Sequence, residues 1–306
     1  MPNLIAATIR QGLFTHVVGK RLLYYPKLTS TMDEAARQAD LGAEDGTVVV
    51  AEVQSAGRGR QGRGWVSEPG NLLVSVLFRP KMDHLPLISI VGGVAAARAV
   101  RKTTGLDTQI KWPNDLLVQG RKIAGILAES AVAGDSVLHA VLGIGINVAL
   151  ETGRSTDIAA SAISINAAAG RDVSREDLLR QLLQDLDVLY LQLDRGQSPI
   201  SEWRGLLETS GQRIEVAWGN KTYSGVAEGV DAGGNAGVYR GVQQHFHDLF
   251  LGAAVLDRAS CVALEFGHLA ERGQDGEVQH GAGLAVEAGA GPGIAPAIFV
   301  HQIGNR

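Results

Sequence analysis

Three arginines alternate with glycines in one short stretch, and cations on a flexible backbone suit an anionic ligand. The stretch runs from Gly57 to Arg63 (GRGRQGR), and Trp65 follows two residues later. Glycines allow such a loop to move over a ligand after it binds, and guanidinium groups bind phosphate and carboxylate strongly. The alternative is a solvated surface loop, because arginines are usually exposed. The alternation favours an anion-binding loop.

The same letters match the G-x-G-x-x-G fingerprint of dinucleotide-binding folds, but their context does not. That fingerprint requires the third glycine to open a helix that crosses over to a parallel strand. Here the turn signal Pro69-Gly70 and an apolar strand at 71–78 follow too soon for a crossover helix. The absence of a following Gly-Lys-Ser/Thr also excludes a P-loop. We therefore expect the two flanking strands to be antiparallel neighbours.

A second polar cluster lies between two strand-like runs. Lys111, Asn114 and Asp115 belong to the run Lys-Trp-Pro-Asn-Asp, and Lys122 follows seven residues after Asp115. Pro113 favours an extended backbone at the residue before it, which predicts a rigid turn. For Lys111, an ordinary ion pair at a sheet rim is as good an interpretation as function. For Asp115 and Lys122, which flank one short strand, we favour function.

Together the two clusters suit transfer of a nucleotidyl group. When a carboxylate attacks the α-phosphate of ATP, two anions meet, and cations must offset the charge that grows on the phosphate oxygens. When an amine then attacks the mixed anhydride, it must be positioned and neutral, which a nearby carboxylate assists. Positioning and electrostatics provide most of this catalysis without a protein nucleophile.

Hydrophobic spacing and capping residues predict the elements that position these clusters. Helices are expected over 4–13, 30–41 and 84–104, and after Ser174, where Ser174 and Asp177 form a start like a capping box. Strands are expected over 21–25, 47–53, 71–78, 115–118, 122–129 and 137–148. After residue 210, the runs 212–217 and 221–230 predict a hairpin of a small barrel.

Composition limits the classes of protein to which the chain can belong. Its 306 residues, 45% hydrophobic, are enough for one large core and a smaller satellite domain. A formal net charge of −4 argues against binding to nucleic acid through the overall field. The single cysteine, Cys261, is typical of a reducing compartment. Without a signal peptide or an uncharged apolar run of about 18 residues, we expect a cytoplasmic protein that contacts no membrane.

Five motifs resemble, in order and approximate spacing, the successive signatures of biotin–protein ligases. They are Ser30-Thr31, QSAGRGRQGR at 54–63, KWPND at 111–115, RKIAGIL at 121–127 and GIGIN at 143–147. The resemblance covers about residues 22–230, and the combination is highly specific. It implies an enzyme that uses ATP to form biotinyl-5'-AMP and transfers biotin to a lysine of a carrier. The carrier would be the biotin carboxyl carrier domain of a biotin-dependent carboxylase.

The resemblance also implies an α+β fold. Residues 1–210 would form a catalytic domain like that of class II aminoacyl-tRNA synthetases, with a mainly antiparallel sheet. A small SH3-like β-barrel would begin at 211–235. Residues 236–306, rich in glycine and histidine, depart from the family pattern and either complete or replace the barrel, as a divergent extension or through a change of reading frame near Gly233. We expect this tail to pack poorly and to hold no metal at His245 and His247.

By residue, the resemblance divides the site into catalytic and binding groups. The catalytic residues would be Lys122, which contacts the biotin carboxylate and the α-phosphate, Asp115, which orients the acceptor lysine, and Arg58. The biotin and adenylate site would comprise Ser30, Thr31, Met32, Gln54, Gly57, Arg58, Gly59, Arg60, Arg63, Trp65, Lys111, Asn114, Lys122, Gly125 and Asn147. In this site, Ser30, Thr31 and Gln54 would bind biotin, and Arg58 to Arg60 would cover the bound biotin. Arg63 would face the phosphates and Trp65 would pack beside the adenine. Asn147 would lie near the adenylate. Mg²⁺ would accompany ATP, held by phosphates more than by the protein.

Two departures from the family bear on function. Met32 stands where the family often has asparagine, and this bears on one polar contact to biotin. About 20 residues precede the first strand, so no DNA-binding domain and no repressor role are implied. A lipoate or other acyl–protein ligase and a non-catalytic module that holds biotin or its carrier stay open as alternatives. A monomer and a homodimer both fit the sequence.

Overall fold

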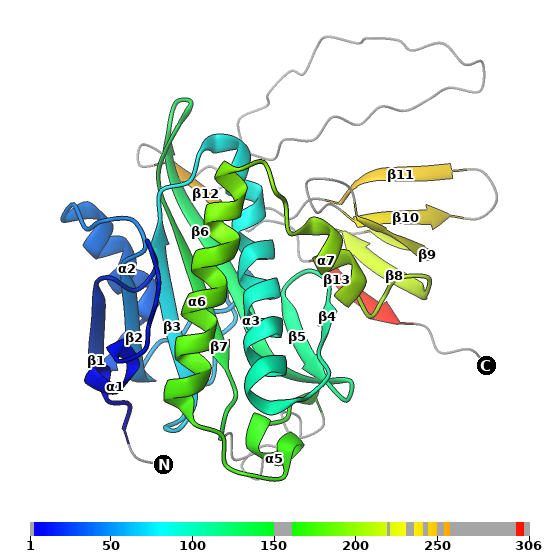
Figure 1. The fold of residues 1–306 in the computed structure, drawn as a ribbon. Helices are drawn as coiled ribbons and strands as arrows, with labels where there is room; N and C mark the ends of the chain where they lie inside the picture. The colour runs from blue at the N-terminus through cyan, green and yellow to red at the C-terminus, as the bar shows by residue number, and fades with distance from the viewer. Residues whose placement is uncertain are drawn as a thin grey trace.

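The computed structural model describes residues 3–149, 161–218, 221–230, 236–240, 244–249, 254–257 and 298–302. Its centre is an eight-stranded sheet in the order β1-β2-β3-β7-β6-β5-β4, with β12 beside β6 (Figure 1). The strands are β1 Leu22–Leu28, β2 Val48–Gln54, β3 Leu72–Phe78, β4 Gln109–Lys111, β5 Asp115–Val118, β6 Arg121–Ala133, β7 Ser136–Ile146 and β12 Ala254–Asp257. The pairs β1–β2 and β12–β6 are parallel, and the others in this sheet are antiparallel. The predicted mixed fold with a mainly antiparallel sheet is confirmed.

Helices cover both faces of this sheet. On one face, α3 (Ile88–Thr104) and α6 (Arg175–Asp194) run side by side over a continuous core (Figure 1). On the other face, α2 (Thr31–Asp40) packs against a smaller cluster that includes Val49 and Leu77. Because strand side chains alternate between faces, Val49 belongs to the second cluster while its neighbours in β2 belong to the first. The shorter helices are α1 Ala6–Arg10, α5 Ile165–Ala169, α7 Ile200–Leu206, and the 3-10 turns η1 Arg60–Gly62 and η2 Met82–Leu87.

Both predicted helix caps form. Ser30 Oγ accepts a hydrogen bond from the Met32 backbone N at 3.2 Å, and Ser174 Oγ accepts one from the Asp177 N at 3.1 Å. Each bond satisfies an N–H that the first turn leaves without a helical partner. Leucines at helical spacing are buried on one face of α6, at positions 178, 179, 182, 183, 186 and 189.

Several predicted elements have other bounds than expected, and β6 continues to Ala133 instead of ending at Glu129. The first helix covers residues 6–10 instead of 4–13, and the first strand continues to Leu28 instead of ending at Tyr25. The long helix predicted from residue 84 begins as α-helix at Ile88, because the segment before it is a 3-10 turn that contains Pro86. Proline disfavours α-helical geometry at the residue before it, here Leu85.

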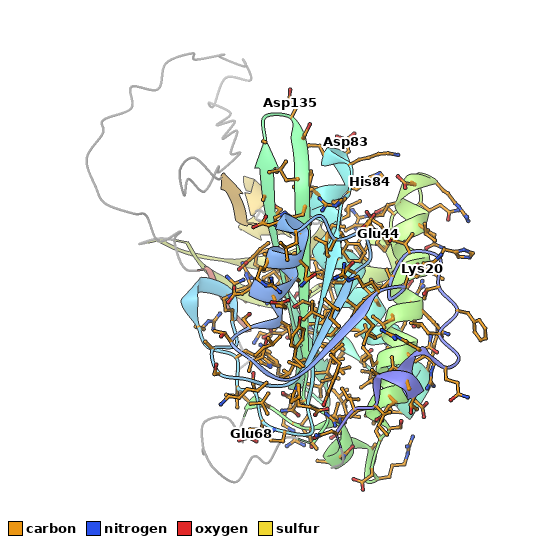
Figure 2. All side chains as sticks on the ribbon, turned by 90° about the vertical axis from the view of Figure 1, so that its left-hand side faces the viewer. Lys20, Glu44, Glu68, Asp83, His84 and Asp135 are labelled. Carbon is orange, nitrogen blue, oxygen red and sulfur yellow. The ribbon has the colours of Figure 1, made fainter. Side chains whose placement is uncertain are left out.

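The most apolar helical segment of the described residues is largely buried, and many charged residues lie at the surface. The segment Met82–Thr104 is long and apolar enough by composition to cross a membrane, but 67% of its most apolar window is buried inside the fold. It therefore has the character of a core helix. Charged residues such as Lys20, Glu44 and Asp135 lie at the periphery, with Asp135 at the tip of the β6–β7 hairpin (Figure 2).

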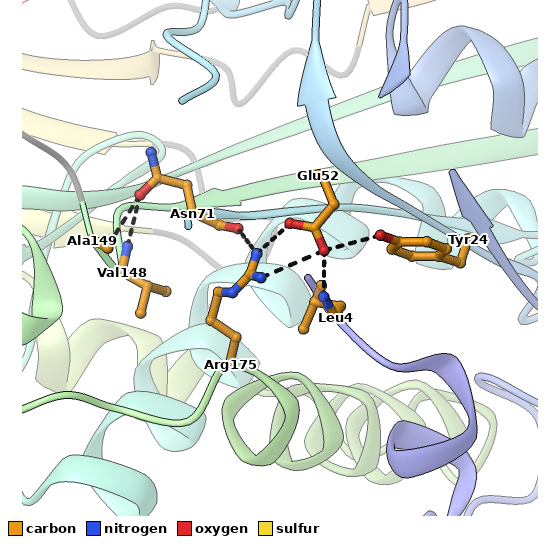
Figure 3. Close-up of polar contacts among 7 residues, drawn as sticks. All are labelled: Leu4, Tyr24, Glu52, Asn71, Val148, Ala149 and Arg175. Carbon is orange, nitrogen blue, oxygen red and sulfur yellow. Dashed lines mark hydrogen bonds and ion pairs between the residues drawn. The ribbon is translucent and has the colours of Figure 1, made fainter. Parts of the chain in front are cut away.

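A buried ion pair connects the N-terminal segment, β2 and α6 (Figure 3). Arg175 donates to Glu52 Oε2 at 2.7 Å and to the Asn71 carbonyl at 3.0 Å. Glu52 also accepts from the Leu4 N at 2.5 Å and from the Tyr24 hydroxyl at 3.2 Å. The side chains of Arg175 and Glu52 are only 3% and 6% exposed, so these additional bonds are needed to offset the loss of hydration. Asn71 Oδ1 then accepts from two backbone N–H groups just after β7, at 3.0 and 3.3 Å.

A second sheet has the order β11-β10-β9-β8-β13. β8 (Arg213–Trp218) and β9 (Lys221–Val230) pair antiparallel, as the hairpin prediction requires. Its other strands, β10 Ala236–Arg240, β11 Gln244–Leu249 and β13 Ile298–Gln302, come from the predicted tail. β12 of the main sheet also comes from this tail. The other residues of the tail, and its side chains including those of His245 and His247, lie outside the described residues. The predictions of a barrel and of a poorly packed tail therefore stay predictions.

Candidate functional site

A cavity of about 190 Å³ brings the two sequence clusters together. Its sides are the start of α2, the loop after β2 and the β4–β5 turn, and its floor is formed by β3, β6 and β7. The predicted site residues that line it are Ser30, Thr31, Met32, Gln54, Arg58, Gly59, Arg60, Arg63, Trp65, Asn114, Asp115, Lys122 and Gly125. Residues from positions as far apart as 30 and 125 thus share one pocket.

Three predicted residues do not belong to the lining. Gly57 lies at the base of the loop, where its carbonyl accepts from the Trp65 N at 2.8 Å. Lys111 ends β4 and pairs with Asp115 across the β4–β5 turn. Asn147 follows β7 and is buried, and its backbone N donates to the Ile123 carbonyl at 2.7 Å.

Glycines on the central strands make room for the pocket. On β6 and β7, Gly125, Gly143 and Gly145 lie on the face that the cavity occupies. A Cβ added to Gly145 would lie 2.5 Å from the Trp65 ring, and one added to Gly143 would lie 2.7 Å from the Met32 Sδ. Real Cβ atoms do not approach so closely, so these positions require glycine as long as Trp65 and Met32 stay in place. Eight lining residues were not among the predicted site residues: Gly64, Leu73 and Val74, and five that lie in the RKIAGIL and GIGIN motifs, Ile126, Leu127, Gly143, Ile144 and Gly145.

At the end of the pocket next to α2, a network of hydrogen bonds orients the polar side chains. The Thr31 N and Oγ1 both donate to Gln54 Oε1, at 2.7 and 2.9 Å. Ser75, on β3, donates from its hydroxyl to Thr31 Oγ1 at 2.8 Å, and Gln54 Nε2 donates to Ser67 Oγ at 3.2 Å. Ser75 and Ser67 carry no motif of their own; only their positions opposite Thr31 and Gln54 reveal them. The network holds hydroxyl and amide groups where they can bind a polar ligand.

Cations gather at the opposite end. Lys122 Nζ lies 2.6 Å from Asp115 Oδ1 and 5.3 Å from the centre of the Trp65 ring, within cation–π range. Arg60 Nη1 donates to Asn114 Oδ1 at 3.4 Å, and Asn114 Nδ2 donates to the Ile126 carbonyl at 2.8 Å. Burial lowers the pKa of the Arg60 guanidinium, and the nearby Asp115 acts against this shift. A guanidinium keeps its charge despite such a shift, so a partly dehydrated cation faces the cavity.

Trp65 lies inside the pocket, against the glycines of β6 and β7. Its ring is the nearest group to the added Cβ positions of both Gly125 and Gly145. Its indole Nε1 is buried and has no hydrogen-bond partner among the described residues. A buried donor without a partner is unfavourable, so this N–H is suited to a ligand that brings an acceptor.

The arginine-glycine loop is a small hairpin rather than an open strand connection. Its backbone is closed by bonds from the Trp65 N to the Gly57 carbonyl at 2.8 Å and from the Gly59 N to the Arg63 carbonyl at 2.7 Å. The strands that it joins, β2 and β3, are antiparallel, which confirms that the glycine fingerprint does not belong to a dinucleotide-binding fold.

Comparison with known proteins assigns this fold and pocket to a class of ligases. The model of the Biotin/lipoate A/B protein ligase family matches residues 24–147. The Bifunctional ligase/repressor BirA of Bacillus subtilis is 35% identical over 235 residues, which are 75% of this chain and 72% of that protein. The chain belongs to the biotin/lipoate A/B protein ligase family.

Within this family, the chain is similar to proteins named for biotin. The Biotin--[acetyl-CoA-carboxylase] ligase of Paracoccus denitrificans is 34% identical and covers 67% of this chain and 88% of its own length. The biotin protein ligase from Aquifex aeolicus in complex with biotin and ATP superposes with a TM-score of 0.63 and 27% identity, over 72% of this chain and 93% of that one.

Proposed function

We propose that this protein is an ATP-dependent biotin–protein ligase, which forms biotinyl-5'-AMP and transfers biotin to a lysine of a biotin carboxyl carrier protein. One observation carries the proposal: a single pocket joins a polar network at Thr31 and Gln54 to a cationic end at Arg60 and Lys122. A molecule with a polar ring at one end and a carboxylate at the other, joined by an apolar tail, fits a pocket with these two ends. The similarity to proteins named as biotin ligases supports the same function.

The first half-reaction joins biotin to AMP. An oxygen of the biotin carboxylate attacks the α-phosphorus of ATP, a P–O bond forms, and the bond to pyrophosphate breaks. Lys122, Arg60 and Arg63, which all line the pocket, offset the negative charge that develops on the phosphate oxygens. No covalent enzyme intermediate is needed, because positioning and charge are sufficient for this step.

The second half-reaction transfers biotin to the carrier. The ε-amine of the carrier lysine attacks the acyl carbon of the mixed anhydride, a C–N bond forms, and AMP leaves with the electron pair of the broken C–O bond. We assign the orientation of this amine to Asp115, whose carboxylate lies in the pocket 2.6 Å from Lys122. The same carboxylate is placed to accept the proton that the amine loses.

The binding roles follow the two ends of the pocket. We assign the biotin ring to Ser30, Thr31 and Gln54, with Met32 as an apolar contact, and the adenine to Trp65. The remaining assignments are Gly57, Gly59 and Arg58 to the covering loop, Asn114 and Gly125 to the adenylate pocket, and Lys111 and Asn147 to its rim.

Mg²⁺ enters this proposal as a companion of ATP. Among the described residues, no three His, Cys, Asp or Glu side chains gather as metal ligands. Among the described residues that line the cavity, Asp115 is the only one with a carboxylate, and it is already paired with Lys122. These residues do not fit a dedicated magnesium site, so the ion would be held by phosphates and water, and no step is assigned to it.

The organisation of the chain is part of the proposal. Residues 1–210 would be the catalytic unit, related to class II aminoacyl-tRNA synthetases, and 211–235 would begin an SH3-like barrel. Pairing of β8 with β9 supports the start of such a barrel. We assign residues 236–306 to a divergent extension of the chain, which completes or replaces the rest of the barrel. A cytoplasmic location is included, because the reaction consumes ATP and the chain has one cysteine.

The test is a reaction with ATP, Mg²⁺, biotin and a biotin carboxyl carrier domain, followed by mass analysis of the carrier. We expect one added biotinyl group, and none on a carrier whose acceptor lysine is replaced by arginine. Adenylate formation with lipoate but not with biotin would point to a lipoate ligase instead. Biotin binding without pyrophosphate release would point to a non-catalytic module.

A further inference from the structure

Arg58 is held by two carboxylates that come from different parts of the fold. Its Nη2 lies 3.0 Å from Asp33 Oδ1, in the first turn of α2, and 2.8 Å from Glu129 Oε2, on β6. The side chains are 37%, 53% and 21% exposed for Arg58, Asp33 and Glu129. Burial raises the pKa of the Glu129 carboxyl, and Arg58 opposes this shift. Glu129 is thus a poorly hydrated carboxylate that is paired with the loop arginine.

The charge balance of this cluster separates Arg58 from the other loop arginines. Two carboxylates face one guanidinium, which leaves the cluster with a net negative charge when all three groups are ionised. Such a cluster repels phosphate, so Arg58 is poorly placed to neutralise ATP directly. Arg60 differs, because its described contact is the neutral amide of Asn114.

Because of the position of Arg58 in the hairpin, its ion pairs can fix other hairpin residues that line the pocket. Arg58 forms an antiparallel bridge with Gly64 across the hairpin, and the base of the hairpin is closed between Gly57 and Trp65. Backbone hydrogen bonds join the two arms of the hairpin, so a contact that fixes Arg58 in one arm also fixes the opposite arm. That opposite strand leads directly to Trp65, and the hairpin tip carries Arg60, both of which line the cavity.

We propose that Asp33 and Glu129 form a carboxylate clamp that holds Arg58, and through it the 57–65 hairpin, over the pocket, so that the reactive adenylate is retained. The clamp consists of positioning residues: neither carboxylate lines the described cavity. The inference rests on the proposed function, because retention matters only if an activated intermediate forms. Arg58 then acts from outside the reacting atoms, by keeping Arg60 and Trp65 in place.

The experiment compares Asp33→Asn, Glu129→Gln and the double variant with the wild-type full-length protein. Adenylate is formed from labelled biotin and ATP without carrier, and its release is followed after adding excess unlabelled adenylate. Partly exposed ion pairs are individually weak, so we expect release to be about threefold faster in each single variant and about tenfold faster in the double. The rate of adenylate formation at saturating substrates should fall by no more than about twofold, because the phosphates of bound ATP attract the Arg60 guanidinium even when the hairpin is not clamped.

Two further measurements separate a clamp from a general structural role. Trypsin cuts after arginine, so cleavage at the loop arginines of the ligand-free protein should accelerate in the same order as release. Raising NaCl to about 0.5 M should accelerate release from the wild type but hardly from the double variant, because salt screens the pairs that the variant lacks. Glu202→Gln is the matched control: it removes the carboxylate from the Arg98–Glu202 pair between α3 and α7, and should change neither readout.

The outcomes decide between distinct conclusions. Release and cleavage at wild-type rates in the double variant would overturn the clamp and leave the proposed function intact. Faster cleavage with unchanged release would overturn its role in retention. If the wild type formed no adenylate, the proposed function would fail, and the cleavage of the ligand-free variants alone would decide whether the clamp holds the hairpin. Thermal unfolding identifies a variant that has lost its fold, and in that case Asp33→Asn, at an exposed helix start, decides the question alone.

Discussion

At the scale of single residues, the cations around the pocket differ in the groups that they contact. Lys122 is paired with Asp115, Arg58 with Asp33 and Glu129, and Arg60 contacts a neutral amide. Arg58 also lines the cavity, but two carboxylates hold it and we assign it to structure, whereas Arg60 has no such carboxylate contact among the described residues and is assigned to an anionic ligand. The arginine-glycine alternation predicts an anion-binding loop but does not distinguish between its arginines, because the partners of Arg58 lie 25 and 71 residues away in the chain.

Replacement of Lys122 by alanine should abolish adenylate formation. The substitution removes a cation from the place where charge develops on the α-phosphate, and losses of about 100-fold or more are typical of such groups. Pyrophosphate release with biotin and ATP measures the effect, and circular dichroism checks the fold. Lys20→Ala, at the periphery, is the control and should keep the wild-type rate (Figure 2). Release at nearly the wild-type rate in Lys122→Ala would refute the role given to this lysine.

At the scale of elements, the cavity exists because β6 and β7 lack side chains at three positions that face it. β6 and β7 carry Gly125, Gly143 and Gly145 on the pocket face, where other strand residues would carry side chains. The sequence predicts these strands and the helix that starts at Ser30, because hydrophobic runs and caps are local signals. It does not predict which face of the strands is hollow, because that depends on the register of β6 and β7 and on where Trp65 enters.

Replacement of Gly145 by alanine should weaken the binding of ATP more than that of biotin. The added Cβ would lie 2.5 Å from the Trp65 ring, so the indole proposed to contact adenine must move. We expect the KM for ATP to rise about tenfold or more, consistent with loss of a well-packed aromatic contact. Steady-state pyrophosphate release at varied ATP measures it. Gly205→Ala is the control, since nothing lies within 4 Å of its added Cβ and alanine favours the helix there. A KM for ATP equal to that of the control would exclude Trp65 from the nucleotide site.

At the scale of the whole molecule, a buried polar network connects segments that the sequence leaves unrelated. Glu52 in β2 and Arg175 at the start of α6 are 123 residues apart, yet they form an ion pair in the interior. Strand and helix periodicity predicts both elements, but it assigns neither residue a partner, because charged residues in a pattern are expected to face solvent. The network also holds the N-terminal segment and, through Asn71, the chain that leaves β7 (Figure 3).

Replacement of Glu52 by glutamine should lower the free energy of unfolding by about 3 kcal/mol, because it leaves a buried guanidinium without its counter-charge. Urea unfolding at neutral pH measures the loss. The double replacement Glu52→Gln with Arg175→Met should recover part of it, since no unpaired charge then remains. Asp107→Asn, in an exposed pair with Arg101, is the control and should cost less than about 0.5 kcal/mol. Equal losses in the single and double variants would show that the charge pairing is not what stabilises this region.

Truncation after residue 235 should leave adenylate formation largely intact. Every residue of the described cavity lining lies between Ser30 and Gly145, and the core beneath it is built from α3, α6 and the main sheet. In the main sheet, the truncation removes only β12, which pairs with β6 at residues 129–132, beyond the part of β6 that lines the pocket. Catalytic units of this size fold independently of small satellites, so we expect a rate within about twofold of the full chain. Pyrophosphate release without carrier measures this half-reaction alone, and biotin transfer to the carrier is measured separately. Loss of adenylate formation in a truncated protein whose thermal unfolding is unchanged would show that the C-terminal segment contributes to the first half-reaction.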